Sequence, residues 1–324
     1  MSGGAHDVAI EIGGTKLQWA VGRAGEPWRC RERRQVVPQE GADGILRQLA
    51  EGIGALRDQY DLRRAGIGFG GPVDCVEGRV MRSHQIRGWE RFPLASWLEE
   101  EFGLPTVVAN DCDTAALGEA RLGAGRGKRS VFYVTVGSGI GGGLVLDGTI
   151  YGTQRPAACE IGHLRPGVKA VDPSQTVESL ASGWGLARQA AARVAHPSIS
   201  DRASDIEDLR RRCGGKDVRI DARLLAEAAS EGNRLAQQVI EDGISTLGWA
   251  VAQVATLFAP EVVVVGGGVS LMGDALFWEP LRKKVRQFVF PPLREKLSMV
   301  PAALGEEVVL HGALLLWDAL RPDA

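Results

Sequence analysis

Apolar and glycine residues form the same local pattern twice in this chain. Residues 8–22, VAIEIGGTKLQWAVG, contain two apolar runs on either side of a glycine pair, which predicts a β-hairpin. Residues 131–147, VFYVTVGSGIGGGLVLD, have the same arrangement and predict a second hairpin. The first glycines of the two turns, Gly13 and Gly137, are 124 residues apart. A similar hairpin at the head of each half suggests an internal duplication.

Strands and helices are expected to alternate along the rest of the chain. Apolar residues at helical spacing predict a helix over residues 42–60, and the sequence LASWLEEEF predicts another over 94–102. Further helices are expected at about 113–122, over much of 180–260, and at about 304–320. Buried strands are expected at 65–74, 106–110 and 261–270. This alternation is typical of the α/β class.

Glycine is in excess, and the excess is concentrated in a few places. Of the 324 residues 43 are glycine, about 13%, against a usual share of about 7%. Fourteen of these 43 lie in four short segments, at 13–14, 66–71, 137–143 and 266–268. Because glycine lets backbone N–H groups approach an anion closely, each segment is a candidate cradle for phosphate.

The glycine motifs do not match the two common nucleotide-binding fingerprints. Gly137, Gly139 and Gly142 have the spacing of the dinucleotide fingerprint, but that fingerprint requires a helix after the turn. Here the apolar strand GLVLDG follows the turn, and the chain contains no GxxxxGK[ST] motif. Two glycine hairpins and a third glycine-rich strand end instead suggest a nucleotide held between two halves of the chain.

Charge and composition exclude several classes of partner. The chain has 38 basic and 40 acidic residues, a net charge of −2, which predicts attraction to neither nucleic acid nor membrane. No apolar run approaches 18 residues and no signal peptide is apparent, so we expect a cytoplasmic protein. The five cysteines are scattered and form no CxxC motif, which argues against a disulfide framework or a cysteine-rich zinc site. The length suggests two domains.

Carboxylates at the ends of predicted strands are the candidate catalytic groups. Asn110 and Asp111 follow the strand at 106–110, and a carboxylate at the carboxyl end of a strand is well placed for chemistry. The alternative is that Asn110 or Asp111 caps the next helix, a task for which Asp113 competes.

A second set of polar residues has an equally plain structural alternative. Glu160 and His163 are three residues apart, so one helical turn or a tight loop would let both face one ligand. Such a pair is more often structural. Glu178 opens a predicted helix, where an acidic residue is also favoured by the helix dipole.

In combination these motifs resemble the ROK family (repressors, open reading frames, kinases) of sugar kinases, in the actin-like ATPase superfamily. VAIEIGGTKLQWAVG and TVGSGIGGGLVLDG look like the family's two phosphate motifs, and AACEIGHL resembles its ExGH motif. VVVVGGGVS resembles the strand and turn on the adenosine side. GIGFGGPVD and GWERFPLASWLEEEFGLPTVVANDCDTAALGEARLGAG resemble the strand, turn and catalytic stretch that lie between. The six motifs occur in the family's order over nearly the whole chain.

This resemblance implies a fold and an arrangement of domains. The fold would be the two-lobed, actin-like ATPase (ribonuclease H-like) α/β fold, with duplicated mixed-sheet domains and a cleft between them. The N-terminal lobe would span residues 1–112 and be joined by a C-terminal helix at about 305–324. The C-terminal lobe would span residues 113–304. A homodimer is implied by the resemblance alone.

The resemblance also implies roles for individual residues. Asp111 would be the general base that takes the proton from a sugar hydroxyl as it attacks the γ-phosphate of ATP. The residues implied to bind the sugar are Gly71, Asn110, Asp111, Glu160, His163 and Glu178. Those implied to hold the nucleotide are Gly13, Gly14, Thr15, Lys16, Thr135, Gly137, Ser138, Gly139, Gly267 and Gly268. Mg²⁺ would supply the remaining positive charge.

The chain departs from the family pattern at several places. The first phosphate motif usually begins with Asp, whereas this chain has Glu11, whose carboxylate lies one methylene farther out and is the candidate contact for Mg²⁺. Members with a structural zinc have a cysteine cluster after ExGH, but the matching stretch VKAVDPSQTVESLASG contains no cysteine. We therefore expect no zinc. Relatives that use polyphosphate also lack this cluster, so the phosphoryl donor stays open.

The function implied is ATP-dependent phosphorylation of a hexose or hexose derivative at its 6-hydroxyl, as in a glucokinase. The alternatives are a catalytically weak sugar-binding or regulatory ROK protein, and a kinase that uses polyphosphate. A transcriptional repressor is disfavoured, because family repressors have an N-terminal helix-turn-helix domain and here the first phosphate motif begins by residue 8. The sugar itself cannot be named from the sequence.

Overall fold

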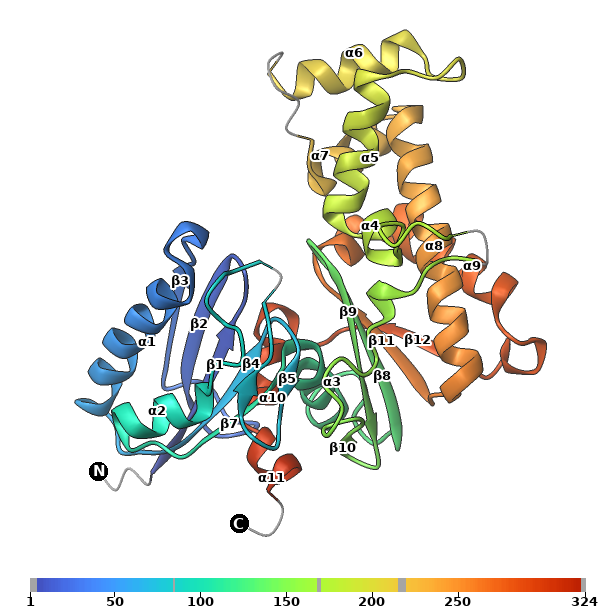
Figure 1. Cartoon of the computed structure of the whole chain (residues 1–324). Helices are drawn as coiled ribbons and strands as arrows, with labels where there is room; N and C mark the ends of the chain where they lie inside the picture. Colours follow the sequence, from blue (N-terminus) through green and yellow to red (C-terminus); the bar gives the residue numbers. More distant parts are fainter. Residues whose placement is uncertain (1–4, 84, 168–169, 215–219, 322–324) are drawn as a thin grey trace. The chain divides into compact units, whose positions relative to one another are not determined.

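A computed structural model describes residues 5–83, 85–167, 170–214 and 220–321 of the chain (Figure 1). The chain divides into two compact units. The first unit consists of Met1–Tyr133, Gly143–Cys159 and Ala302–Ala324, and the second of Val134–Gly142 and Glu160–Pro301. The lobe boundaries expected from the sequence stay a prediction, and residues 322–324 of the expected C-terminal helix lie outside the described residues.

The first sheet is mixed and belongs to the first unit. Its strands are β3 (Cys30–Gln35), β2 (Lys16–Gly22), β1 (His6–Ile12), β4 (Leu62–Phe69) and β7 (Thr106–Asn110), in that spatial order. Strands β1, β2 and β3 pair antiparallel, which confirms the hairpin predicted over residues 8–22. Strands β1, β4 and β7 pair parallel, so their carboxyl ends meet at one edge of the sheet.

Alternation of side chains along β1 and β2 gives the two faces of this sheet different partners. Trp19 points to helix α1 (Gly41–Arg57), where a Cβ on Gly52 would lie only 2.3 Å from the indole ring. Ala9 and Ala20 point to the other face and pack against helix α10 (Val308–Ala313). Helix α1 therefore packs on the face of Trp19 and helix α10 on the face of Ala9 and Ala20. Figure 1 shows where the two helices lie against the sheet.

Three further helices complete the first unit. Helix α2 (Leu94–Phe102) has the predicted bounds, and it ends at Gly103 in a left-handed conformation. Helix α3 (Asp111–Arg121) begins two residues before the predicted start, because Asn110 caps it. The single helix expected at about 304–320 is wrong: the chain forms α10 and then α11 (Leu316–Leu320). In α11, after the break, the indole Nε1 of Trp317 donates a hydrogen bond to the carbonyl of Ala65 at 2.9 Å.

The strand expected over 65–74 is also divided. Strand β4 ends at Phe69, and after the Gly70–Gly71–Pro72 turn the chain continues as β5 (Val73–Asp74), which pairs with β6 (Arg79–Val80). The short 3₁₀ and π segments of the chain are η1 (Pro38–Glu40), η2 (Ile161–His163), η3 (Gly268–Met272), η4 (Asp274–Trp278), η5 (Pro291–Leu293) and η6 (Gly305–Glu307).

The second sheet contains the second predicted hairpin. Its order is β10 (Thr149–Ile150), β9 (Ile140–Leu146), β8 (Ser130–Val136), β11 (Val262–Gly266) and β12 (Ser298–Pro301). Strands β8 and β9 are neighbours joined by the turn at 137–139, which confirms the hairpin expected over 131–147. Strand β11 is a run of buried valines that ends in glycine and pairs parallel with β12.

The second unit is rich in α-helices. They are α4 (Val177–Ala181), α5 (Gly183–Ala195), α6 (Ala203–Arg212), α7 (Ala222–Ser230), α8 (Arg234–Phe258) and α9 (Glu279–Phe288). Helix α8 is the longest, with 25 residues, and its buried face carries Leu247, Val251 and Ala255. Among the described residues, no helix combines the length and the apolar character needed to cross a membrane.

Candidate active site

Three chain segments of the first unit meet at the carboxyl edge of its sheet. The N–H of Gly70, just after β4, donates to the carbonyl of Ile12 at the end of β1, over 2.8 Å. A Cβ on Gly70 would lie 3.5 Å from the Asp111 carboxylate oxygen Oδ2 and 3.5 Å from the Cα of Gly13. Gly70 therefore lies between the first glycine turn and the candidate base, a position that the sequence did not single out.

Asn110, rather than Asp111 or Asp113, is the cap of helix α3. Its side-chain oxygen accepts from the N–H of Cys112 at 2.8 Å and of Asp113 at 3.3 Å. Its side-chain NH₂ donates to the carbonyl of Gly71 at 3.0 Å. The amide is thus fixed from both ends, which holds the Gly71 turn against the start of the helix. The capping alternative is settled in favour of Asn110.

Asp111 is the first residue of helix α3 and is partly exposed. Its oxygen Oδ1 accepts from the N–H of Cys112 at 2.9 Å. A carboxylate in the first turn of a helix interacts favourably with the helix dipole. A carboxylate next to a glycine turn is suited to accept a proton from a ligand that the turn helps to bind.

The first glycine turn is tight and lies beside a carboxylate. The N–H of Gly13 donates to the carbonyl of Lys16 at 2.8 Å, which closes the turn. The Lys16 ammonium lies 2.8 Å from Oε1 of Glu11, and the side chains are only 21% and 11% exposed. A Cβ on Gly14 would overlap the exposed side chain of Gln85, which would have to move aside.

In the second unit, Glu178 is joined to the second glycine turn. Its oxygen Oε2 accepts from the N–H of Ile140 at 2.8 Å. A Cβ on Gly139 would lie 2.5 Å from the same oxygen. A Cβ on Gly162, between Glu160 and His163, would lie 2.0 Å from the carbonyl of Ile140. The ExGH segment and Glu178 are therefore both packed on the strand that leaves this turn.

The start of helix α5 and the third glycine segment are close to the same turn. The N–H groups of Gly183 and Trp184 donate to the carbonyls of Gly137 and Ser138, at 2.8 and 3.3 Å. Gly267 has a φ of +89°, and a Cβ there would lie 2.5 Å from the carbonyl of Val136. Only glycine tolerates both the backbone conformation and this close approach.

The predicted site residues divide into two groups, one in each unit. The first contains Glu11, Gly13, Gly14, Thr15, Lys16, Gly71, Asn110 and Asp111. The second contains Thr135, Gly137, Ser138, Gly139, Glu160, His163, Glu178, Gly267 and Gly268.

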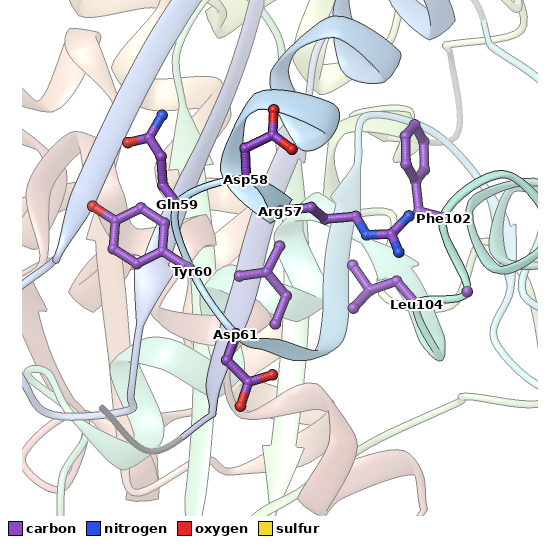
Figure 2. Close-up of a pocket in the computed structure, with 9 residues that line it drawn as sticks. Arg57, Asp58, Gln59, Tyr60, Asp61, Phe102 and Leu104 are labelled. Carbon is purple, nitrogen blue, oxygen red and sulfur yellow. The ribbon is translucent and has the colours of Figure 1, made fainter. Parts of the chain in front are cut away.

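A separate pocket of about 500 Å³ lies at the opposite edge of the first sheet (Figure 2). It is formed where α1 leads into the start of β4 and where α2 leads toward β7, with Arg57, Tyr60 and Phe102 among its lining residues. None of the predicted site residues lines it. Parallel α/β sheets carry their ligands at the carboxyl ends of their strands, so this pocket is not the candidate active site.

The buried thiol of Cys75, in the first unit, is chemically unreactive. Burial, followed by the charges of Asp113 and Asp74, raises the pKa of Cys75 to about 12. A thiol with such a pKa stays protonated near neutral pH and is a poor nucleophile or metal ligand. Among the described residues, no three His, Cys, Asp or Glu side chains converge so as to hold a metal ion. The expected absence of zinc stays a prediction.

Residues 7–319 match the ROK family, and the chain belongs to that family. It is 31% identical to the glucokinase of Streptomyces coelicolor over 98% of each chain. It is 30% identical to the glucokinase of Halalkalibacterium halodurans, covering 94% of this chain and 92% of the relative.

Solved structures agree with these sequence relatives. A ROK family glucokinase from Streptomyces griseus, in complex with glucose and AMPPNP, superposes with a TM-score of 0.79 at 30% identity. The match covers 96% of this chain and 99% of that protein. The fold is the actin-like ATPase fold expected from the sequence, and the expected enzyme class, a sugar kinase, is confirmed.

Proposed function

We propose that the chain transfers the γ-phosphoryl group of ATP to the 6-hydroxyl of a hexose, with glucose as the first candidate. The observation that carries this proposal is the position of Asp111, at the first turn of α3 and beside Gly70 and the Gly13 turn. The glucokinase of known structure that matches 96% of this chain binds glucose and AMPPNP, which supports both the sugar and the nucleotide.

Asp111 would act as the general base. Its carboxylate would take the proton of the 6-hydroxyl as the sugar oxygen forms a bond to the γ-phosphorus. The bond from the γ-phosphorus to the bridging oxygen would break, and ADP would leave. Most of the catalytic effect in such a transfer comes from positioning and from neutralising charge, so a fixed carboxylate is sufficient as the base.

Sugar hydroxyls would be bound by side chains whose orientations are already fixed by the fold. Asn110 is held by its cap and by Gly71, and Glu178 is held by the N–H of Ile140. Each side chain presents its remaining hydrogen-bonding capacity in a defined direction, which reduces the entropy lost on binding. Glu160 and His163 would bind further hydroxyls at the ends of the segment η2.

The glycine turns would bind the nucleotide. In the first unit the turn from Gly13 to Lys16 would hold phosphate oxygens through N–H groups and the Lys16 ammonium. In the second unit Thr135, Gly137, Ser138 and Gly139 would bind phosphate, and Gly267 and Gly268 would lie under the adenosine. Glu11 is an oxygen ligand of the kind that Mg²⁺ takes, and Mg²⁺ would neutralise charge on the transferred group.

A coupled assay over several sugars tests this function. The purified chain would be assayed with ATP and Mg²⁺ against glucose, fructose, mannose, N-acetylglucosamine, N-acetylmannosamine and allose, and then with polyphosphate in place of ATP. We expect turnover with ATP and at least one of these hexoses, with the 6-phosphate as product. Turnover with polyphosphate alone would favour the second donor. Sugar binding by calorimetry without turnover would favour the catalytically weak, regulatory alternative.

A further inference from the structure

We propose that Gln18 is a positioning residue for Glu11, holding its carboxylate in place when Lys16 moves from Glu11 to a bound phosphate. This inference rests on the proposed function, because it assigns a task to the first glycine turn during nucleotide binding. Gln18 lies within the stretch of residues 8–22 that resembles the first phosphate motif, but the resemblance implied no role for it. It follows the turn by two residues, on strand β2.

The side chain of Gln18 is almost completely buried and bonds to two acceptors. Only 1% of the surface of the whole residue is exposed to solvent. Nε2 donates to Oε2 of Glu11 at 2.5 Å and to the backbone carbonyl of Glu306 at 3.3 Å. Because both neighbours can only accept, the NH₂ group of the amide must face them, and its two hydrogens account for the two bonds.

The backbone brings Gln18 and Glu11 together directly. The two residues are opposite each other in the antiparallel pair of β1 and β2. Their side chains therefore emerge on the same face of the sheet, which is the face of Ala9 and Ala20 that the C-terminal segment covers. No rearrangement of the backbone is needed for the amide to reach the carboxylate.

The two oxygens of Glu11 have different kinds of partner. Oε1 is paired with the Lys16 ammonium, which belongs to the turn proposed to bind phosphate. Oε2 is bonded to the neutral amide of Gln18. A polyphosphate would attract the lysine but not the amide. When Lys16 turns to a phosphate, Oε1 is released toward the nucleotide and its Mg²⁺, whereas Oε2 stays bonded.

The segment that contains Glu306, the second acceptor of Gln18, is also held in place by side-chain contacts. The carboxylate of Glu306 pairs with Arg33 at 2.8 Å, and the carboxylate of Glu307 accepts from the Trp28 indole at 2.7 Å. Both partners lie on or next to β3, the neighbour of β2. The carbonyl that Gln18 uses therefore belongs to a segment tied to the same sheet.

A glutamate needs such a partner more than an aspartate would. Its side chain has one more rotatable bond, so it has more conformations to lose when it is fixed. Glu11 is also buried, and a buried carboxylate oxygen without a donor is costly. Gln18 provides both the restraint and the donor.

The first experiment compares Gln18→Leu with a matched control, Gln48→Leu. Gln48 lies on α1 in the same unit and donates to the carbonyl of Gln35 at 3.3 Å, with no bond to Glu11. For Gln18→Leu we expect about a tenfold loss in kcat and in calorimetric affinity for Mg·ADP, with the sugar KM changed less than about twofold. Gln48→Leu should change none of the three by more than about twofold. Equal losses in both variants would overturn the proposal.

A double-mutant cycle then asks whether Gln18 acts through Glu11. In a Glu11→Ala background, Gln18→Leu should no longer change the Mg·ADP affinity. If the tenfold loss persists without Glu11, the proposal is wrong. Should Gln18→Leu melt below the assay temperature, Gln18→Asn replaces it, because this amide is one methylene too short to keep both bonds and should show the same loss.

This design separates the inference from the function on which it rests. If the wild-type chain phosphorylates no hexose but binds Mg·ADP, the proposed function fails and the cycle still decides the role of Gln18. If the wild-type chain does not bind Mg·ADP, the inference itself is overturned.

Discussion

Asn110 and Asp111 are consecutive residues that the structure gives separate tasks. Asn110 supplies the cap of α3 and holds Gly71, so these tasks do not fall to the carboxylate that follows. Asp111 lies beside Gly70, at the position that a side chain on Gly70 would approach. The division lets a neutral residue stabilise the helix while the charged one lies where a substrate hydroxyl is expected.

His311 makes stability depend on pH. Burial lowers the pKa of this histidine, against the opposing charges of Glu307 and Glu119, and its ring lies 4.8 Å from that of Trp28. Because the folded chain holds this proton less tightly than the unfolded chain, the unfolded state binds more protons as the pH falls below about 6.5. The free energy of unfolding should therefore decrease as the pH is lowered through that window.

Urea unfolding at a series of pH values between about 7.5 and 5.5 measures this effect, over the range in which an ordinary histidine titrates. His311→Gln should reduce the slope of unfolding free energy against pH. The control for the substitution itself is His196→Gln, at an exposed histidine, measured over the same pH series. An unchanged slope in His311→Gln would show that this histidine is not the source.

Some contacts of the candidate site could not be predicted from the sequence. The amide of Gln18 bonds to the carbonyl of residue 306, which is 288 positions away. Gly70 is one of four glycines in a short run, and only the positions of Ile12 and Asp111 show which of them faces the site. The site residues that the sequence did indicate all belong to local motifs, where the spacing itself carries the information.

Helices α3 and α10 cross at a distance that only glycine allows. A Cβ on Gly312 would lie 1.8 Å from the carbonyl of Thr114, and one on Gly118 would lie 2.8 Å from the carbonyl of Val308. Helix α10 is equally close to the sheet, since a Cβ on Gly66 would lie 1.9 Å from the carbonyl of Ala313. The helix that begins with Asp111 is thus held to the sheet through α10, backbone against backbone.

Two glycine-to-alanine changes should act in opposite directions. Gly312→Ala should destabilise the chain by about 2 kcal/mol or more, because the new methyl group overlaps the backbone of α3. Gly54→Ala should stabilise it by about 0.5–1 kcal/mol, because Gly54 lies within α1 and a Cβ there meets nothing within 4 Å. Chemical denaturation measures both. Equal effects of the two changes would contradict the crossing described for α3 and α10.

The elements that the sequence predicted best are those with complete local signals. Both hairpins, helix α2 and strand β7 have glycine turns, helix stops or a short apolar run at their ends. The C-terminal helix was predicted as one piece because its apolar periodicity continues through residues 314–315. After the division, the Trp317 indole donates to the carbonyl of Ala65, a contact between distant parts of the sequence that the local pattern does not reveal.

The turn of the first hairpin belongs to the first unit and the turn of the second hairpin to the second unit, and the internal duplication stays a prediction. Each hairpin turn lies beside a carboxylate: that of Glu11, on the first strand of the same hairpin, and that of Glu178, from helix α4. Asp111 belongs to the first unit, and the ExGH segment belongs to the second. Family members are thus recognised from motifs that are spread over the whole length of the chain.

The stretch after the ExGH motif gives a prediction about metal content. It contains no cysteine, so we expect the purified chain to carry no stoichiometric zinc and to melt at the same temperature with and without a strong chelator. Elemental analysis measures the first and a thermal melt the second. About one zinc per chain, or a marked loss of stability on chelation, would contradict this expectation.

The role of Asp111 is the central claim, and one variant tests it most directly. In Asp111→Asn the side chain keeps its size but can no longer take a proton, so kcat with ATP and the best hexose should fall by at least about a hundredfold. Binding of that hexose, measured by calorimetry on the same preparation, should change by less than about threefold, a difference of less than about 0.7 kcal/mol. Normal turnover by Asp111→Asn would contradict the assignment of the base.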